Sequence, residues 1–256
     1  MTTPKRSDAQ PEIDIVDLHK SFGDNQVLTG VNLRVPEGST CVILGGSGSG
    51  KTVLMKHMIG LLKPDKGQVI IDGEDIAGFG AAQLEQVRRK FGMVFQAAAL
   101  FDSMTVYQNV SFPLREHRGK LKEDEMREIV RRKLGIVGLE GVEDKFPADL
   151  SGGMRKRVGL ARAIVLDPKI VLYDEPTTGL DPITTDSVDE MILTAKRELG
   201  VTSVVISHDV ASAFKVADNI AFLYQGLIVD QGPPEALRDS QQPAVKLFLQ
   251  TWFGKN

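Results

Sequence analysis

Eight consecutive residues have the types and spacing of a phosphate-binding loop, or P-loop: Gly45, Gly46, Ser47, Gly48, Ser49, Gly50, Lys51 and Thr52. Glycines are needed in such a loop because backbone N–H groups must approach phosphate oxygens without intervening side chains. Lys51 is expected to reach the β- and γ-phosphates of a nucleotide, and the Thr52 hydroxyl to ligate Mg²⁺. The structural alternative is a glycine-rich turn without a ligand. The apolar run before the loop and the helical pattern after it favour the phosphate site.

A pair of carboxylates follows a second apolar run. Residues 170–173 indicate a buried strand, and Asp174 and Glu175 come directly after it. Open α/β sheets bind ligands at the carboxyl ends of their strands, so Asp174 is expected beside the P-loop, where it would hold Mg²⁺ through its water shell. Glu175 would polarise the attacking water as general base. A strand that ends in surface acids gives the same local pattern, but the P-loop favours the catalytic interpretation.

A second candidate anion site is the sequence Leu150-Ser151-Gly152-Gly153-Met154, which leads into a basic helical stretch. Ser151 is a good N-cap, and the two glycines leave the first turn open to an anion. An ordinary capped helix is the structural alternative. The chain thus has two helix N-termini suited to phosphate but one P-loop lysine. Either each chain binds two phosphate ligands, or the second site completes the first on a partner chain.

The strands and helices that must position these residues follow a recognisable pattern. Strands are predicted at residues 12–18, 27–35, 40–44, 69–71, 93–95, 170–173, 203–206, 220–224 and 228–230. Most alternate with helical stretches, such as residues 51–62, which favours a mostly parallel sheet covered on both faces. Residues 97–165 carry helical patterns, at 123–134 and 152–166, and no strand. We therefore expect a helical lobe at 97–165, inserted into an α/β core formed by 1–96 and 166–240.

The composition is that of an ordinary globular protein, with 42% hydrophobic and 25% charged residues. The single cysteine, Cys41, rules out an intrachain disulfide and fits a reducing compartment. No apolar run approaches the roughly 18–20 residues that a membrane helix needs, and the N-terminus lacks the apolar stretch of a signal peptide. The net charge of −3 offers no global attraction to nucleic acid, and the basic residues 155–157 are interpreted as a solvated helix face. If the protein works at a membrane, we expect other chains to supply the spanning part.

The motifs and their order resemble those of the ATP-binding subunits of ABC transporters, over nearly the whole chain. Residues 150–154 are similar to the signature sequence of that family, which binds ATP in trans across a head-to-tail dimer. Gln96 matches the glutamine of the Q-loop, a Mg²⁺ and water contact linked to the membrane subunit. Asp181 lies in a match to the D-loop, and His208 matches the switch histidine that senses the γ-phosphate. Phe22 fits the aromatic residue that stacks on adenine.

The resemblance implies a role for each of these positions. The implied catalytic residues are Lys51, Gln96, Glu175 and His208. The implied cofactors are ATP and Mg²⁺, and the metal would be held by Thr52, Gln96 and Asp174. Nucleotide contacts are expected at Phe22, Gly45, Gly46, Ser47, Gly48, Ser49, Gly50, Lys51, Thr52, Val53, Gln96, Ser151, Gly152, Gly153, Asp174 and Asp181. The implied fold is that of a P-loop NTPase, an α/β protein with a RecA-like core, an N-terminal antiparallel β subdomain and an inserted α-helical signature subdomain. The implied assembly is a homodimer that drives a separate integral-membrane permease.

Met154 stands where most ABC signatures carry glutamine. This departure, together with residues 46–56 and 96–106, resembles the Mla/Mce-type lipid-transport ATPases. In that family the ATPase pairs with a lipid permease, and a periplasmic MCE-domain protein and often a small STAS-domain protein complete the complex. The resemblance implies phospholipid transport between bacterial membranes, with this subunit on the cytoplasmic face of the inner membrane. Residues 97–104 would line the groove for the permease's coupling helix or pack in the core of the helical lobe.

Other functions fit the sequence less well. A soluble ABC ATPase acting on nucleic acid or ribosomes usually carries a long coiled coil or a second cassette, and neither pattern is present. A P-loop kinase or GTPase leaves residues 150–154 and His208 unexplained. An ABC importer for amino acids, metals or another small solute shares every catalytic motif and remains the alternative within transporters.

The C-terminal segment 241–256 is expected to form an amphipathic tail. Its helical pattern places Ala244, Val245, Phe248, Leu249 and Trp252 on one face. This face would dock on a neighbouring subunit or pack against its own domain.

Overall fold

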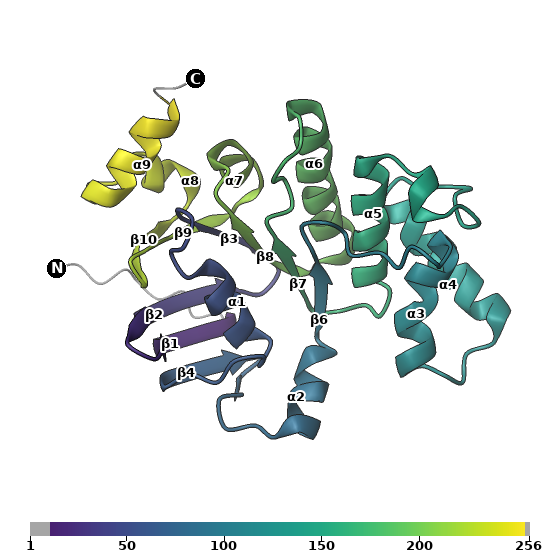
Figure 1. Ribbon diagram of the computed structural model, residues 1–256, viewed down its shortest axis with the longest axis horizontal. Coiled ribbons are helices and arrows are strands. Elements are labelled where there is room, and N and C mark those ends of the chain that lie inside the picture. Colours follow the sequence, from purple (N-terminus) through teal and green to yellow (C-terminus); the bar gives the residue numbers. More distant parts are fainter. Residues whose placement is uncertain (1–10, 254–256) are drawn as a thin grey trace.

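The computed structural model describes residues 11–253 (Figure 1). Residues 1–10, which include most of the N-terminus expected to lack a signal peptide, and residues 254–256 of the expected tail lie outside the described residues. In chain order the elements are β1 (Pro11–Phe22), β2 (Asn25–Pro36), β3 (Thr40–Leu44), α1 (Lys51–Met58), β4 (Lys66–Ile71), β5 (Glu74–Asp75), α2 (Ala81–Arg88), β6 (Phe91–Val94), α3 (Val106–His117), α4 (Glu123–Ile136), η1 (Pro147–Asp149), α5 (Gly152–Ala163), β7 (Ile170–Asp174), α6 (Pro182–Leu199), β8 (Thr202–Ser207), α7 (Val210–Val216), β9 (Asn219–Tyr224), β10 (Leu227–Gly232), α8 (Pro234–Arg238) and α9 (Pro243–Phe253).

The central sheet has six strands in the order β10-β9-β3-β8-β7-β6. Strands β9, β3, β8, β7 and β6 run parallel, and β10 pairs antiparallel with β9 at one edge. Successive residues of β3 face opposite cores, with Val42 and Leu44 in one and Cys41 and Ile43 in the other. Burial on both faces explains why these strands read as continuous apolar runs. The prediction of a mostly parallel, covered sheet is confirmed.

A second sheet, in the order β2-β1-β4-β5, is antiparallel throughout. It shares one core with α1 and one face of the central sheet. Helices α6 and α7 contribute to the other core, which continues into the inserted helices α3, α4 and α5 (Figure 1). The fold is therefore the α/β P-loop NTPase fold with an antiparallel β subdomain and a helical insertion.

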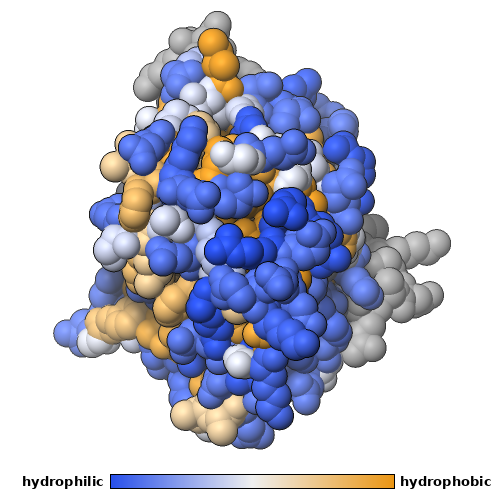
Figure 2. Space-filling view, turned by 90° about the vertical axis from the view of Figure 1, so that its right-hand side faces the viewer, coloured by the Kyte–Doolittle hydropathy of each residue, from blue (hydrophilic) through white to orange (hydrophobic). Residues whose placement is uncertain are grey.

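The inserted helices are held by local signals and by an apolar inner face. Thr105 accepts a hydrogen bond from the backbone N–H of Gln108, whose side chain accepts one from the backbone N–H of Thr105, so a capping box begins α3. Val110, Leu114, Val130 and Leu134 of α3 and α4 are fully buried. The face turned away from the central sheet is mostly hydrophilic, with small apolar patches between the charged side chains (Figure 2).

Several element ends differ from the sequence predictions. Helix α1 ends at Met58 instead of residue 62, since Gly60 takes a left-handed backbone with φ of 63°. Helix α5 ends at Ala163 instead of 166, and β6 ends at Val94, so Gln96 lies two residues beyond the strand. In the described part of the chain, no helix is both long and apolar enough to cross a membrane.

Candidate active site

The loop between β3 and α1 has the path that its glycines permit. A methyl group on Gly45 would lie 2.4 Å from the carbonyl oxygen of Leu223, closer than real side chains approach. Gly50, the N-cap of α1, has a φ of 104°, which favours glycine strongly. The loop therefore ends on a helix N-terminus whose first N–H groups have no helical partner.

Lys51 lies buried under this loop. Its Nζ donates hydrogen bonds to the carbonyl oxygens of Gly45 at 2.8 Å and Gly46 at 3.0 Å, and lies 3.8 Å from Oε1 of Glu175. Burial lowers the pKa of Lys51, although the charge of Glu175 opposes that shift. The Ser49 hydroxyl is buried without a hydrogen-bond partner. An orphaned hydroxyl beside open helix N–H groups and an ammonium group suits a phosphate ligand.

Glu175 is held in one position by three contacts. Its backbone N–H donates to the carbonyl oxygen of Ile206 at 3.0 Å, and its Oε2 accepts from the Thr178 hydroxyl at 2.7 Å. Nδ1 of His208 lies 2.5 Å from the same oxygen. The backbone of Glu175 has a φ of 50°, a left-handed conformation that costs a non-glycine residue about 1–2 kcal/mol. Strain at a well-held carboxylate is a feature of functional sites.

The Thr178 contact was not predicted from the sequence. A hydroxyl side chain three residues after a catalytic acid is a sequence signal that could have predicted this contact, because a short turn brings the hydroxyl back to the carboxylate. The turn is present here, with the backbone N–H of Thr178 donating to the carbonyl oxygen of Glu175 at 3.3 Å.

Asp174 ends β7 half-buried, next to Glu175. Burial raises the pKa of this carboxyl, and the neighbouring charge of Glu175 raises it further. Thr52 is exposed in the first turn of α1. A half-buried carboxylate at the end of β7 and an exposed hydroxyl in the first turn of α1 are oxygen ligands of the kind that fits Mg²⁺, which takes few protein oxygens and completes its shell with phosphate and water. Residues 11–253 hold no cluster of three or more His, Cys, Asp or Glu arranged for a metal.

One cavity of about 1130 Å³ gathers most of the expected residues. It is lined by Val27, Gly46, Ser47, Gly48, Ser49, Gly50, Lys51, Thr52, Val53, Gln96, Glu175, Thr178, His208, Phe222, Tyr224, Ala244, Leu247, Phe248, Thr251 and Trp252. Phe22 is outside this lining. Its ring is 48% exposed at the end of β1, with Lys20 Nζ 5.6 Å from the ring centroid.

The C-terminal helix forms an unexpected wall of the same cavity. Val245 and Leu249 of α9 are buried, and the Phe248 ring lies 5.0 Å from the Phe222 ring, so the amphipathic face packs against its own domain. Leu247, 67% exposed, lines the cavity from another side of the helix. The sequence predicted the packing face but gave no signal for this second contact. Docking of the tail on a neighbouring subunit remains a prediction.

The second phosphate-ready helix terminus lies apart from the cavity lining. Ser151 caps α5 by accepting a hydrogen bond from the backbone N–H of Met154 at 3.2 Å, and Gly152 beside it is exposed. Asp181 caps α6, accepting from the backbone N–H groups of Ile183 and Thr184 at 3.0 Å each. Within one chain, then, the P-loop and the Ser151 turn do not share a cavity.

A parallel sheet that presents a P-loop and paired carboxylates at one edge defines a nucleoside-triphosphate hydrolase of the P-loop class. Residues 28–178 match the family model described as ABC transporter, and the chain belongs to this family as an ATP-binding, ATP-hydrolysing subunit.

Known relatives and solved structures agree with this family. The chain is 47% identical over 237 residues to the "Probable ribonucleotide transport ATP-binding protein mkl" of Mycobacterium tuberculosis, covering 93% of this chain and 66% of that relative. It is 40% identical to the "Intermembrane phospholipid transport system ATP-binding protein MlaF" of Escherichia coli, covering 93% and 88%. The dimeric cassette MJ0796, in a post-hydrolysis state bound to ADP and Pi, superposes with a TM-score of 0.77 at 32% identity, covering 87% and 98%.

Proposed function

We propose that this chain hydrolyses MgATP as one half of a homodimer and thereby drives phospholipid transport through a separate membrane permease. The observation that supports the catalytic part most directly is the joint position of Lys51, Glu175 and His208 in one cavity. In this arrangement one edge of the sheet carries a residue to bind phosphate, Lys51, a residue to activate water, Glu175, and a residue to sense the γ-phosphate, His208.

The residues of the cavity have different roles in hydrolysis. Lys51 exchanges its two carbonyl acceptors for phosphate oxygens when ATP binds. Thr178 and His208 hold Oε2 of Glu175, which leaves Oε1 to accept the proton of the attacking water. Thr52, Gln96 and Asp174 would hold Mg²⁺, which supplies charge neutralisation on the β- and γ-phosphates when bound. The exposed ring of Phe22 is available to stack on adenine.

The dimer explains the separate Ser151 turn. In our proposal Ser151, Gly152 and Gly153 of one chain complete the γ-phosphate site of its partner, and Asp181 lies at the same junction. The helix N-terminus at Ser151 is exposed and so accessible to a second chain. The dimeric state reported for MJ0796 supports this arrangement. The division into a core (1–96 and 166–240), a signature lobe (97–165) and a tail (241–256) belongs to the same proposal.

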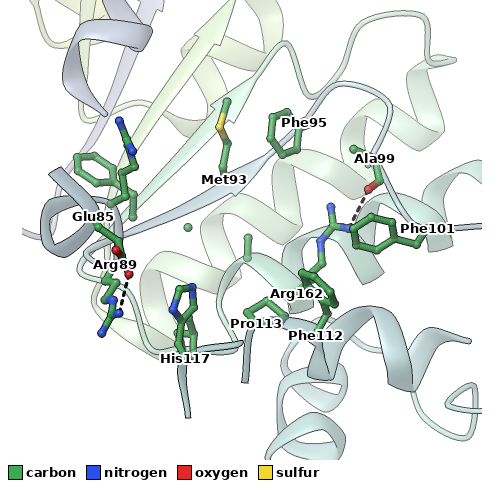
Figure 3. A pocket seen from close by; sticks show the side chains of 15 residues that line it. Glu85, Arg89, Met93, Phe95, Ala99, Phe101, Phe112, Pro113, His117 and Arg162 are labelled. Atoms are coloured by element: carbon green, nitrogen blue, oxygen red, sulfur yellow. Dashed lines mark hydrogen bonds and ion pairs between the residues drawn. The ribbon is translucent and has the colours of Figure 1, made fainter. Parts of the chain in front are cut away.

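A cavity of about 500 Å³ between α2, α3, α5 and the end of β6 is the proposed permease site (Figure 3). Met93, Phe95, Phe101, Phe112 and Pro113 give it an apolar lining, and Arg89, Arg162 and His117 lie around them. An amphipathic helix from the permease fits such a groove.

Part of the segment 97–104 packs in the core of the helical lobe, and the rest belongs to the proposed permease site. Ala98 is buried, and its side chain would lie 3.3 Å from a methyl group on Gly159, so it packs in the lobe. Ala99 and Phe101 line the proposed permease site, and Arg162 donates to the carbonyl oxygen of Ala99 at 2.8 Å.

Phospholipid is the proposed cargo because of the MlaF relatives and the Mla/Mce-type flanking sequence. The mkl relatives bear a ribonucleotide-transport name, which keeps a small solute as the second candidate. An MCE-domain protein, a STAS-domain protein and a place on the cytoplasmic face of the inner membrane belong to the lipid proposal. Affinity purification of the native complex, with identification of the permease and any bound lipid, tests it. Recovery of a solute importer without lipid would contradict the phospholipid assignment.

The catalytic proposal is tested with Glu175→Gln. Removing the general base should lower kcat by about 10²–10⁴-fold and leave ATP binding intact, so that ATP traps a dimer. Phosphate release and size-exclusion chromatography with ATP measure both. A monomer that keeps full activity would contradict the dimer mechanism.

A further inference from the structure

Lys156 is a buried lysine in the second turn of α5, only 7% exposed. Its Nζ donates a hydrogen bond to the carbonyl oxygen of Pro176, the residue directly after Glu175. Among residues 11–253 it makes no salt bridge, and burial lowers the pKa of its ammonium group. Burying an ammonium without a carboxylate partner costs free energy that an apolar side chain of similar length would not. Packing alone therefore does not explain a lysine at this position.

The accepting carbonyl belongs to the strained turn that carries Glu175. The backbone of Glu175 has a φ of 50°, and its N–H is fixed from one side by Ile206. Pro176 is buried and has no N–H, so its carbonyl oxygen is the backbone polar atom through which this residue can be anchored from the other side. Lys156 provides that anchor.

The same helix is fixed to the neighbouring element by a second contact. Arg157 donates to the Ser187 hydroxyl of α6 at 2.5 Å, and α5 and α6 lie side by side (Figure 1). With α5 held in this way, the Lys156 ammonium group has a defined position relative to the end of β7. The helix that begins at Ser151 is thus joined directly to the turn of the catalytic carboxylate.

We propose that Lys156 is a positioning residue, which holds the Glu175 carboxylate in its catalytic place through the carbonyl of Pro176. The inference rests on the proposed function of Glu175 as general base. It predicts that loss of the Lys156 donor slows hydrolysis without weakening nucleotide binding.

The test compares Lys156→Met with Lys156→Arg. Methionine has a similar length and no donor, and a misplaced carboxylate should lower kcat by about 10–100-fold while KM for ATP stays unchanged. Arginine keeps a donor and should restore most of kcat. Lys133→Met is the matched control, because Lys133 is likewise a buried lysine of the helical lobe, but it pairs with Asp167 and not with the turn of Glu175. It should leave kcat unchanged. If Lys156→Met does not fold, Lys156→Leu, which also lacks a donor, takes its place.

A second measurement separates this role from a general effect on the dimer. In the Glu175→Gln background, Lys156→Met should leave the ATP-trapped dimer intact, because the carboxylate it positions is already gone. An unchanged kcat for Lys156→Met, or loss of the trapped dimer, would overturn the inference. Failure of Glu175→Gln alone to form that dimer would instead count against the proposed function.

Discussion

Nδ1 of His208 lies 2.5 Å from Oε2 of Glu175, and this contact joins the ends of the neighbouring parallel strands β8 and β7. Two side chains that are 33 positions apart in the sequence meet because parallel strands end at the same sheet edge. The hydroxyl of Thr178 reaches the same oxygen, so the carboxylate has two side-chain donors and one oxygen left for chemistry.

Removal of these two donors should have unequal effects. His208→Ala removes a side chain that also lines the cavity, and we expect kcat to fall by about 10²-fold or more. Thr178→Val keeps the shape and removes one hydrogen bond to the Glu175 carboxylate, worth about 1.5 kcal/mol or more because the acceptor is charged, so kcat should fall by about 10-fold. ATPase rates at saturating ATP measure both. A Thr178→Val enzyme as slow as His208→Ala would show that the hydroxyl has a larger role than a supporting donor.

Lys51→Ala should abolish tight ATP binding, because no other ammonium group lines the described cavity. Binding of a fluorescent ATP analogue and ATPase activity should be lost together. Lys66→Ala, at an exposed position of β4, is the control and should bind ATP as the wild type does. ATP binding that survives in Lys51→Ala would contradict the assignment of the phosphate site.

The sequence predicted those parts of the fold and site that depend on local pattern. The strand predicted at residues 40–44 has the bounds of β3, the helix predicted from Lys51 begins there as α1, and the strand predicted at 170–173 is one residue shorter than β7. The ends of the longer strands were not predicted. In β1, for example, register shifts near Asp17, which has a φ of 47°, interrupt the alternation of buried and exposed side chains. Thr178 and Lys156 act through turns and helix packing, and such contacts have no sequence periodicity. The cavity wall from α9 depends on tertiary docking and could not be predicted from an amphipathic pattern.

Helix α9 should contribute to stability as well as to the cavity. Val245 and Leu249 are buried, and a chain truncated before residue 243 exposes their apolar partners. We expect a lower Tm for this truncation, measured by calorimetry. Leu247→Glu changes an exposed position and should leave Tm unchanged, so it tests docking separately. If Leu247→Glu leaves assembly with the permease unchanged, the side of α9 that carries Leu247 has no role in docking.

Asp189 should make the stability of the fold depend on pH. It is buried on α6 and accepts a hydrogen bond from the Ser212 hydroxyl of α7. Burial raises its pKa from 3.8 to about 6; the Ser212 hydroxyl and the charge of Lys215 oppose the shift, and Asp186 and Asp209 add to it. Because the folded state keeps this proton to a higher pH than the unfolded chain, stability falls as pH rises from about 4 to about 6.

Above that window the ionised carboxylate lowers stability by up to about 3 kcal/mol, at 1.36 kcal/mol for each unit of pKa shift. Asp189→Asn keeps an oxygen for Ser212 and removes the titration. It should therefore unfold at higher urea concentration than the wild type at pH 8, with the difference shrinking toward pH 4. Asp186→Asn, an exposed carboxylate that pairs with Lys215, is the control and should not remove this pH dependence. Parallel pH profiles for the wild type and Asp189→Asn would show that Asp189 does not carry the raised pKa.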